Sequence, residues 1–245
     1  MKSALVITPT TGASVLCDAV DSVQKQDYKN LEHLVVIDGN KFTDTTYSII
    51  DKCKIDNISV NIATLPYNTG GGGFYGHRVM AGFSHLVPHD YILFLDQDNW
   101  YEPNHVSSLI KEIESLNYDW AYSLRNIYTD NKEYVCHDDC ESLGRWSVWV
   151  KEGEHLIDSS SYCFTNQFLR QVGHIWDWGW GADRRFYMTL KTKLNHKNYG
   201  CNNKYTLNYR TGGNEGSVTP EFFIQGNEVM RKKYNNKYPW NLEVK

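Results

Sequence analysis

The sequence contains no long apolar run. No stretch of its 245 residues reaches the roughly 18 to 20 consecutive apolar side chains that a membrane-spanning helix needs. The apolar residues near the start are broken by Pro9, which makes them too short for the core of a secretory signal and typical of a first buried strand. We therefore expect no transmembrane segment and, by default, a cytoplasmic location.

The sequence also lacks an excess of positive charge. It has 25 Lys and Arg residues against 29 Asp and Glu residues, a formal net charge of −4. No global positive field therefore draws the protein to nucleic acid or anionic lipid, and we expect no nucleic-acid partner. The hydrophobic fraction of 41% and the aromatic fraction of 14% are sufficient for a packed core and exclude a mainly disordered chain.

Cysteines are few and scattered. Six cysteines in a chain of this size do not make the dense pattern of a disulfide framework. The one closely spaced pair is Cys136 and Cys140, and a zinc site there needs further ligands that no second paired cluster provides. We therefore expect a reduced, polar loop around these two residues.

Short apolar runs and amphipathic segments alternate along the first half of the chain. This pattern predicts an α/β fold with a Rossmann-type, mostly parallel central sheet flanked by helices. In such sheets, ligands bind beyond the carboxyl ends of the strands. The predicted strands cover residues 4–8, 34–38, 58–65 and 91–95, and the predicted helices cover 13–26, 43–53, 77–86 and 104–116.

The pattern weakens beyond about residue 118. We predict a single domain over residues 1–245, with the sheet-forming half at 1–117 and a loop-rich half at 118–245 that ends in a helix over 222–238. Residues 208–218 have the composition of a mobile loop that closes over a bound ligand, where Arg210 would meet a diphosphate. An ordinary connecting loop is the alternative.

Two carboxylates close the predicted strand at 91–95. Asp96 and Asp98 are separated by one residue, so in an extended chain both side chains face the same cleft. Adjacent carboxylates repel each other unless a cation or hydrogen bonds neutralise them, and Mn²⁺ or Mg²⁺ bridged to a diphosphate would do so. The alternative is a polar turn after a strand, where Asp is common.

A run of four glycines precedes the predicted helix at 77–86. Glycines allow close backbone approach to a ligand and leave amides free to bind an anion, so the segment 66–78 is a candidate phosphate loop. A mobile surface loop is the alternative. Arg78 at the helix start would pair with a phosphate or with Asp38 or Asp96.

In their order and spacing over residues 3–117, these segments resemble the family 2 glycosyltransferases, which have the GT-A fold. The matching motifs are the strand ending in Thr8-Pro9-Thr10, the strand ending in Asp38-Gly39, the block of Asn68, Gly70 and Arg78, and the Asp-x-Asp of residues 96–98. The glycine run is longer than usual for that family.

The resemblance implies roles for these residues in binding a nucleoside-diphosphate sugar, with a UDP-type donor favoured. Thr8, Pro9, Thr10 and Asp38 would hold the base and ribose, and Asn68, Gly70 and Arg78 would complete the donor site. Asp96 would lie against the ribose or sugar and beside the metal, and Asp98 would bind the metal. The half at 118–245 would bind the acceptor.

The family also has a later acidic motif that carries the catalytic base. The matching segment here runs from Trp178 to Phe186, where Ala182 replaces the usual Glu and Asp183 is kept. Asp183 would deprotonate an acceptor hydroxyl during a displacement that inverts the anomeric configuration. Asp177 is the rival base on the acceptor side, and an acid interacting with a helix N-terminus is the alternative for Asp183.

Tryptophans surround these two acids at alternate positions. Flat aromatic faces bury the apolar C–H surface of a sugar, so Trp178 and Trp180 are predicted to bind a saccharide or glycoconjugate acceptor. Alternatively, some of the three rings at 176, 178 and 180 belong to the core beneath the cleft.

The combined prediction is a metal-dependent, inverting glycosyltransferase that moves a sugar from a nucleoside-diphosphate sugar to an acceptor hydroxyl. A sugar nucleotidyltransferase is an alternative, although it would carry a Gly-rich, Arg-containing loop directly after the first strand. A non-catalytic carbohydrate-binding protein would use the tryptophans but has little need of Asp96, Asp98 and Asp183. A DNA-base glycosyltransferase is disfavoured by the acidic net charge.

Overall fold

The structure is a computed structural model of the chain and describes residues 1–212 and 218–242. Strands and helices alternate in its first half, as predicted. The strands are β1 (Ala4–Thr10), β2 (Leu31–Ile37), β3 (Ser59–Thr64), β4 (Tyr91–Phe94), β5 (Trp100–Tyr101), β6 (Trp120–Tyr128), β7 (Tyr134–His137), β8 (Tyr162–Thr165) and β9 (Tyr199–Arg210).

Helices connect and cover these strands. The α-helices are α1 (Leu16–Gln24), α2 (Thr43–Ile50), α3 (His77–Phe83), α4 (His105–Leu116), α5 (Asn166–Val172), α6 (Ala182–Met188), α7 (Pro220–Lys233) and α8 (Pro239–Leu242). Shorter turns are the 3-10 helices η1 (Asn40–Phe42), η2 (Ser159–Ser161) and η3 (Gly173–Trp176) and the π-helical turn η4 (Thr189–Lys193). Among the described residues, no helix is both long and apolar enough to cross a bilayer.

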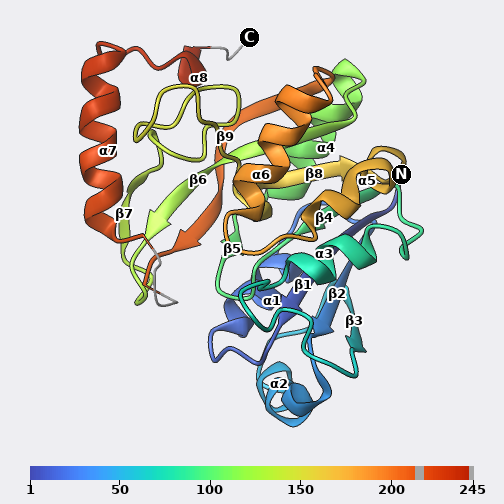
Figure 1. Cartoon of the computed structure of the whole chain (residues 1–245). Coiled ribbons are helices and arrows are strands. Elements are labelled where there is room, and N and C mark those ends of the chain that lie inside the picture. The colour runs from blue at the N-terminus through green and yellow to red at the C-terminus, as the bar shows by residue number, and fades with distance from the viewer. Residues whose placement is uncertain (213–217, 243–245) are drawn as a thin grey trace.

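The described strands form one nine-stranded sheet. Its order is β3-β2-β1-β4-β8-β6-β9-β5, with β7 paired to β6 (Figure 1). Strands β1 to β4 run parallel to their neighbours in this group, which confirms the α/β fold with a parallel sheet for the first half. In Figure 1, β1, β2 and β3 lie at one end of the molecule, and α7 lies beside β7 at the other.

The second half is more regular than predicted and makes the sheet mixed. Strand β8 runs antiparallel to both β4 and β6, whereas β6 and β9 pair in parallel over most of their length. The predicted parallel sheet is thus extended by these strands, and the half predicted to be loop-rich contains β6 to β9. The strands there are rich in Tyr and Asn, and their register shifts between Tyr122 and Arg125, so no clear period of two was visible in the sequence.

The core has two layers, one on each face of the sheet. Alternate residues of β1 point to opposite faces, so Leu5 and Ile7 pack with α3, α5 and α6, whereas Ala4 and Val6 pack with α1 and α4. Each helix therefore buries one apolar stripe against the sheet. This packing holds the strand ends, and the polar residues that follow them, in fixed positions.

Aromatic rings fill the layer beneath α6. Trp176 is fully buried and stacks on Phe186 with ring centroids 4.1 Å apart. Trp120 of β6 stacks on Tyr199 of β9 at 4.2 Å. Of the three tryptophans at 176–180, Trp176 is therefore a core residue, and it fixes the start of α6.

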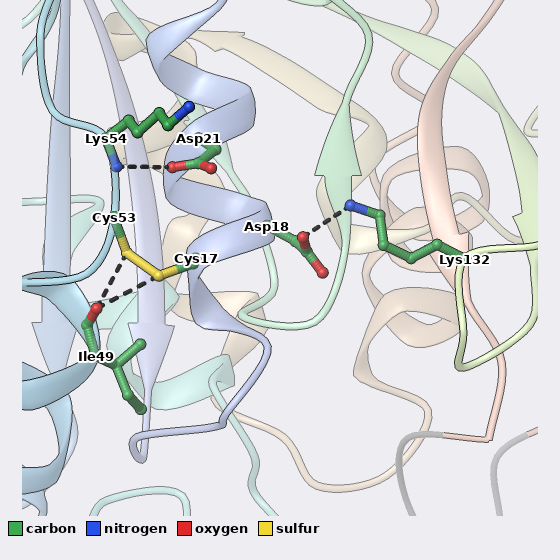
Figure 2. The surroundings of a disulfide bond; sticks show 7 residues. All are labelled: Cys17, Asp18, Asp21, Ile49, Cys53, Lys54 and Lys132. Atoms are coloured by element: carbon green, nitrogen blue, oxygen red, sulfur yellow. Dashed lines mark hydrogen bonds and ion pairs between the residues drawn. A yellow bond between two sulfur atoms is a disulfide. The ribbon is translucent and has the colours of Figure 1, made fainter.

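A disulfide joins Cys17 of α1 to Cys53, which follows α2. Figure 2 shows the bond beside Asp21, whose carboxylate accepts a hydrogen bond from the backbone N–H of Lys54 at 3.2 Å. On the other side of α1, Asp18 pairs with Lys132 at 2.7 Å. The sequence did not predict this bond, because the two cysteines are 36 residues apart and belong to no spacing pattern. The other four cysteines are free.

The segment from Cys136 to Ser142 is organised by a carboxylate. Asp138 is fully buried, and its two oxygens accept hydrogen bonds from the backbone N–H groups of Cys140, Glu141 and Ser142 at 2.8–3.0 Å. Cys140 is buried as a thiol near Phe223 of α7. The Asp138 carboxylate therefore holds this segment in a tight turn.

The C-terminal predictions need two corrections. Residues 208–210, predicted as part of a mobile loop, are the end of β9, where they pair with β6. Residues 213–217 of that predicted loop lie outside the described residues. The helix predicted over 222–238 is α7, which starts at Pro220 and ends at Lys233, so it begins and ends earlier than predicted, and the short α8 follows it.

Candidate active site

A cavity of about 490 Å³ opens at the carboxyl ends of β1, β2 and β4 and extends under the start of α6. Most of the site residues predicted from the sequence line it. These residues are Pro9, Thr10, Asp38, Asn68, Gly70, Asp96, Asp98, Trp180 and Asp183. The sheet therefore brings together residues that are up to 174 positions apart, at the edge where parallel strands present their ligand-binding ends.

Four predicted site residues lie elsewhere. Thr8 is fully buried in β1, where its hydroxyl lies 2.9 Å from the Nε2 atom of His33. Arg78 donates from Nε to Asp177 at 2.9 Å, and its guanidinium also stacks on Phe74. Neither Arg78 nor Asp177 lines the cavity, and neither does Trp178. The sequence predicted a phosphate, Asp38 or Asp96 as the partner of Arg78, and its pairing with Asp177 was not predicted.

Asp96 is held by the turn that precedes β8. Its Oδ2 atom accepts hydrogen bonds from the hydroxyls of Ser159 at 3.0 Å and Ser160 at 3.2 Å, and its backbone N–H donates to Ser160. Burial, together with the nearby Asp158 and Asp98 carboxylates, raises the pKa of Asp96 to about 7. The hydrogen bonds from the two serine hydroxyls lower the pKa but offset only part of this increase.

Asp98 lies one step further along the same segment. Burial and the Asp158 carboxylate raise its pKa, and the guanidinium of Arg210 opposes this increase. Arg210 donates from Nε to the backbone oxygen of Asp98 at 3.0 Å and also pairs with Asp18 of α1. The positive charge of Arg210 is therefore shared between the cavity and α1.

Arg125 of β6 lies at the back of the cavity and contacts three carboxylates. It donates to Asp138 at 2.7 Å, to Asp158 at 2.6 Å and to Glu141 at 2.6 Å. Its side chain is only 3% exposed. A buried cation with three well-placed acceptors is fully satisfied, but it leaves the acids with an excess of negative charge.

Asp158 connects Arg125 to Asp96. One of its oxygens accepts from Arg125, and the other accepts from the backbone N–H of Ser160 at 2.8 Å at the start of η2. That turn presents the two serine hydroxyls to Asp96. Arg125 therefore fixes the position of Asp96 through two intermediate groups.

Asp183 lies in the first turn of α6 and lines the cavity. Burial raises its pKa to about 6, and Asp158 contributes to the increase, whereas the N–H of Arg184 donates to it at 2.7 Å and lowers it. A carboxylate with such a pKa is ionised at neutral pH and is still a better proton acceptor than an ordinary aspartate.

The glycine run forms a loop that is anchored by Asp38. The Asp38 carboxylate accepts three hydrogen bonds of 2.8 Å, from the N–H and hydroxyl of Thr69 and from the N–H of Gly70. A Cβ atom at Gly70 would lie 2.0 Å from the backbone oxygen of Tyr75, so only glycine fits there. Asp38 thus fixes the start of the loop as well as lining the cavity.

The glycine loop packs against the tryptophan segment that precedes α6. His77 lies 3.1 Å from the backbone oxygen of Trp178 through Nδ1, and a Cβ atom at Gly179 would lie 3.2 Å from the oxygen of Gly73. Trp178 lies under the guanidinium of Arg185 at 3.6 Å. Trp180 is 76% exposed and borders the cavity, so its face is available to a ligand.

Sequence reasoning missed several groups that line the cavity: Gln97, Arg125, Glu141, Asp158 and Tyr209. Gln97 could have been found from its place inside the Asp-x-Asp motif. Asp158 precedes three serines, which is a cap signal of moderate strength. Nothing in the local sequence marks Arg125, because its acidic partners lie 13 to 33 residues further along, in the connection between β7 and β8.

The residues present fit a divalent cation shared with a diphosphate. Among the described residues, six carboxylates and three guanidinium groups line the cavity. Burial and repulsion from nearby carboxylates raise the pKa values of Asp96 and Asp98. Within residues 1–212 and 218–242, no group of three His, Cys, Asp or Glu side chains is placed to hold a metal by itself. Mg²⁺ and Mn²⁺ sites completed by phosphate oxygens need only one or two carboxylates.

Comparison with protein families gives one decisive match. The model of glycosyl transferase family 2 matches residues 5–154, which is more than half of the chain. The chain belongs to glycosyl transferase family 2. The matched range includes the strand ends and both acids of the Asp-x-Asp segment, and the family prediction made from the motifs is confirmed.

Two family relatives are similar in sequence. An uncharacterized glycosyltransferase of Bacillus subtilis (strain 168), YwdF, is 23% identical over 194 residues, covering 73% of this chain and 66% of YwdF. An uncharacterized glycosyltransferase of Rickettsia bellii (strain RML369-C) is 31% identical over 116 residues, covering 46% of this chain and 15% of that protein. The chain therefore spans less than two thirds of each relative.

Solved structures share the fold of this family 2 chain. The structure of S. aureus TarS 1–349 in complex with UDP has a TM-score of 0.62 at 19% identity and covers 96% of this chain and 66% of the TarS chain. The complex of the same fragment with UDP-GlcNAc has a TM-score of 0.61 at 18% identity, with 96% and 67% coverage. This similarity confirms a sheet flanked by helices of the glycosyltransferase type.

Replacing Arg125 with Met tests whether the buried cation holds the back of the cavity together. We expect the free energy of unfolding to fall by ~3–5 kcal/mol, because three carboxylates would lose their shared partner inside the protein. Urea unfolding followed by tryptophan fluorescence measures this change. The matched control is Arg231→Met, which removes an exposed ion pair with Glu228 and should leave the unfolding midpoint unchanged. Equal effects of the two substitutions would contradict the role of Arg125.

Proposed function

We propose that this chain transfers a sugar from a nucleoside-diphosphate sugar, with a UDP-type donor favoured, to a hydroxyl of a saccharide or glycoconjugate acceptor. The observation that carries this proposal is the meeting of Asp96, Asp98 and Asp183 in one cavity at the strand ends. Two of these acids suit a cation and the third suits a base. Family membership supports sugar transfer as the reaction, and the proposal adds the donor, the metal and the stereochemistry.

The nucleoside would occupy the end of the cavity near β1 and β2. Thr10, Asp38 and Asn68 line that end, and the backbone of the glycine loop closes it from the side. Binding of UDP and UDP-GlcNAc by TarS 1–349 favours a uridine donor here as well.

The diphosphate would lie between the nucleoside and the acids. Asp98, with Asp96 beside it, would hold Mn²⁺ or Mg²⁺ against the phosphate oxygens, where a divalent cation stabilises the negative charge of the departing nucleoside diphosphate. Arg210 fixes the segment of Asp98 by binding its backbone oxygen. The Asp98 segment is thus positioned through its backbone oxygen, which leaves the Asp98 carboxylate without a hydrogen bond from Arg210.

Asp183 would act as the base on the acceptor side. It would accept the proton of the acceptor hydroxyl while that oxygen attacks the anomeric carbon from the face opposite the nucleoside diphosphate, so the configuration inverts. The exposed face of Trp180 borders the same end of the cavity and would stack on a sugar ring of the acceptor.

The ion pair of Asp177 with Arg78, outside the cavity, favours Asp183 over Asp177 as the base. A cytoplasmic location stays a prediction.

Calorimetric titration with UDP, GDP and dTDP tests the donor and metal parts of the proposal. We expect binding of UDP in the presence of Mn²⁺ and a decrease in affinity of at least about tenfold in the variant Asp98→Ala, because the charged contact to the bound ion is lost. Asp44→Ala, an exposed acid on α2, is the control and should bind as the wild type does. Binding that ignores both the metal and Asp98 would contradict the metal assignment.

The pH dependence of donor consumption tests the base. At saturating donor, acceptor and Mn²⁺, the rate should rise with pH through about 6 and level off above it, because the pKa of Asp183 is raised and only its ionised form accepts a proton. The variant Asp183→Asn should lose about 10²–10⁴-fold in rate. Asp177→Asn should stay within a few-fold of the wild type, since Asp177 lies outside the cavity. The reverse pattern in the two variants would make Asp177 the base.

A further inference from the structure

The residue between the two acids, Gln97, turns its side chain toward the loop that follows β1. Its Oε1 atom accepts a hydrogen bond from the hydroxyl of Thr10 at 2.7 Å and from the backbone N–H groups of Thr11 at 3.1 Å and Ala13 at 3.3 Å. The Thr10 hydroxyl in turn accepts from the N–H of Gly12 at 3.0 Å. The amide of Gln97 thus holds the whole turn between β1 and α1.

These contacts fix which end of the amide faces the cavity. Two of the three donors to Oε1 are backbone N–H groups, which cannot accept a hydrogen bond, so the nitrogen of the amide cannot take the place of the oxygen. Among the described residues, Nε2 of Gln97 has no hydrogen-bond partner, and Gln97 is a half-buried residue that lines the cavity. The side chain therefore offers its NH₂ group, and no acceptor, to a bound ligand.

Among the described residues at this end, the Oδ1 atom of Asn68 also lacks a hydrogen-bond partner, whereas the polar atoms of Asp38 and Thr10 are largely engaged. The carboxylate of Asp38 already accepts three hydrogen bonds from Thr69 and Gly70. The hydroxyl of Thr10 has used its one proton on Gln97. The Gln97 NH₂ group is thus a fixed donor beside the part of the cavity assigned to the nucleoside.

We propose that Gln97 determines which nucleobase the donor site accepts, by donating to the carbonyl oxygen at position 4 of a pyrimidine or position 6 of a purine. This inference rests on the proposed binding of a nucleoside diphosphate. Uracil, thymine and guanine carry an oxygen at that position, whereas cytosine and adenine carry an amino group there. An amino group would face the Gln97 donor with another donor, and both groups would lose their hydrogen bonds to water without replacement.

UDP and CDP give the sharpest comparison, because they differ on the base only in the oxygen or amino group at position 4 and the associated ring proton. We expect the wild type, with Mn²⁺ present, to bind UDP at least about tenfold more tightly than CDP, as one mismatched buried hydrogen bond requires. Calorimetric titration gives both dissociation constants. GDP and ADP form a second pair with the same carbonyl and amino contrast.

Gln97→Glu is the informative variant. A glutamate oxygen still accepts hydrogen bonds from Thr10, Thr11 and Ala13, so the turn after β1 stays in place. The unpaired NH₂ group is replaced by an oxygen that can only accept a hydrogen bond. The added negative charge weakens the binding of every nucleoside diphosphate, so the ratio of the UDP and CDP dissociation constants is the quantity to compare. We expect the preference for UDP to fall by at least about tenfold or to reverse.

Gln97→Met is the companion variant, since it removes donor and acceptor at nearly constant volume. We expect it to bind UDP and CDP with similar affinity. Thermal unfolding of both variants shows whether each is folded before the titrations are interpreted. A UDP to CDP ratio in Gln97→Glu and Gln97→Met equal to that of the wild type overturns the inference.

The outcomes for the wild type separate this inference from the function on which it rests. If the wild type binds no nucleoside diphosphate with Mn²⁺, the donor assignment fails and this inference fails with it. If it binds UDP and CDP equally, nucleotide binding stands and only the role of Gln97 is overturned. A preference for CDP over UDP would overturn it in the same way.

Discussion

The buried guanidinium of Arg125 is the contact on which the candidate site depends. It donates one hydrogen bond to each of three acids, Asp138, Glu141 and Asp158, which all lie in the connection between β7 and β8. Asp158 then orders the turn η2, and η2 holds Asp96 with serine hydroxyls. The three N–H groups of a lysine diverge from a single nitrogen, whereas the planar guanidinium spreads its donors over three nitrogens, each of which bonds a different acid here. The back of the cavity is therefore a hydrogen-bonded unit centred on one side chain.

This unit leaves the cavity with more negative charge than it can neutralise. Burial and repulsion from nearby carboxylates raise the pKa values of Asp96, Asp98 and Asp183. Such clusters contribute little to stability and are typical of functional sites. Under the proposed function, a divalent cation would offset the charge of Asp98 and leave Asp183 to accept a proton.

Prediction from sequence succeeded where the signal was local. Short apolar runs ending in polar residues identified β1 to β4, and Asp96 and Asp98 were found because they directly follow one of these runs. Prediction failed for contacts between residues that are separated along the chain. The pairing of Arg78 with Asp177, the disulfide between Cys17 and Cys53, and the contacts of Arg125 all depend on how loops meet in space. The Tyr- and Asn-rich strands β6 and β9 were not predicted, because their sequences show no clear alternation of apolar and polar residues. They form strands because they pair with each other in the sheet.

A crystal structure of the chain with UDP and Mn²⁺ tests the donor site most directly. We expect the ion on Asp98, the diphosphate between it and the glycine loop, and the uracil beside Gln97 at the ends of β1 and β2. Asp183 and Trp180 should stay free to receive an acceptor. A nucleotide bound outside this cavity, or inside it with the ion away from Asp98, would show that the strand-end acids do not form the donor site.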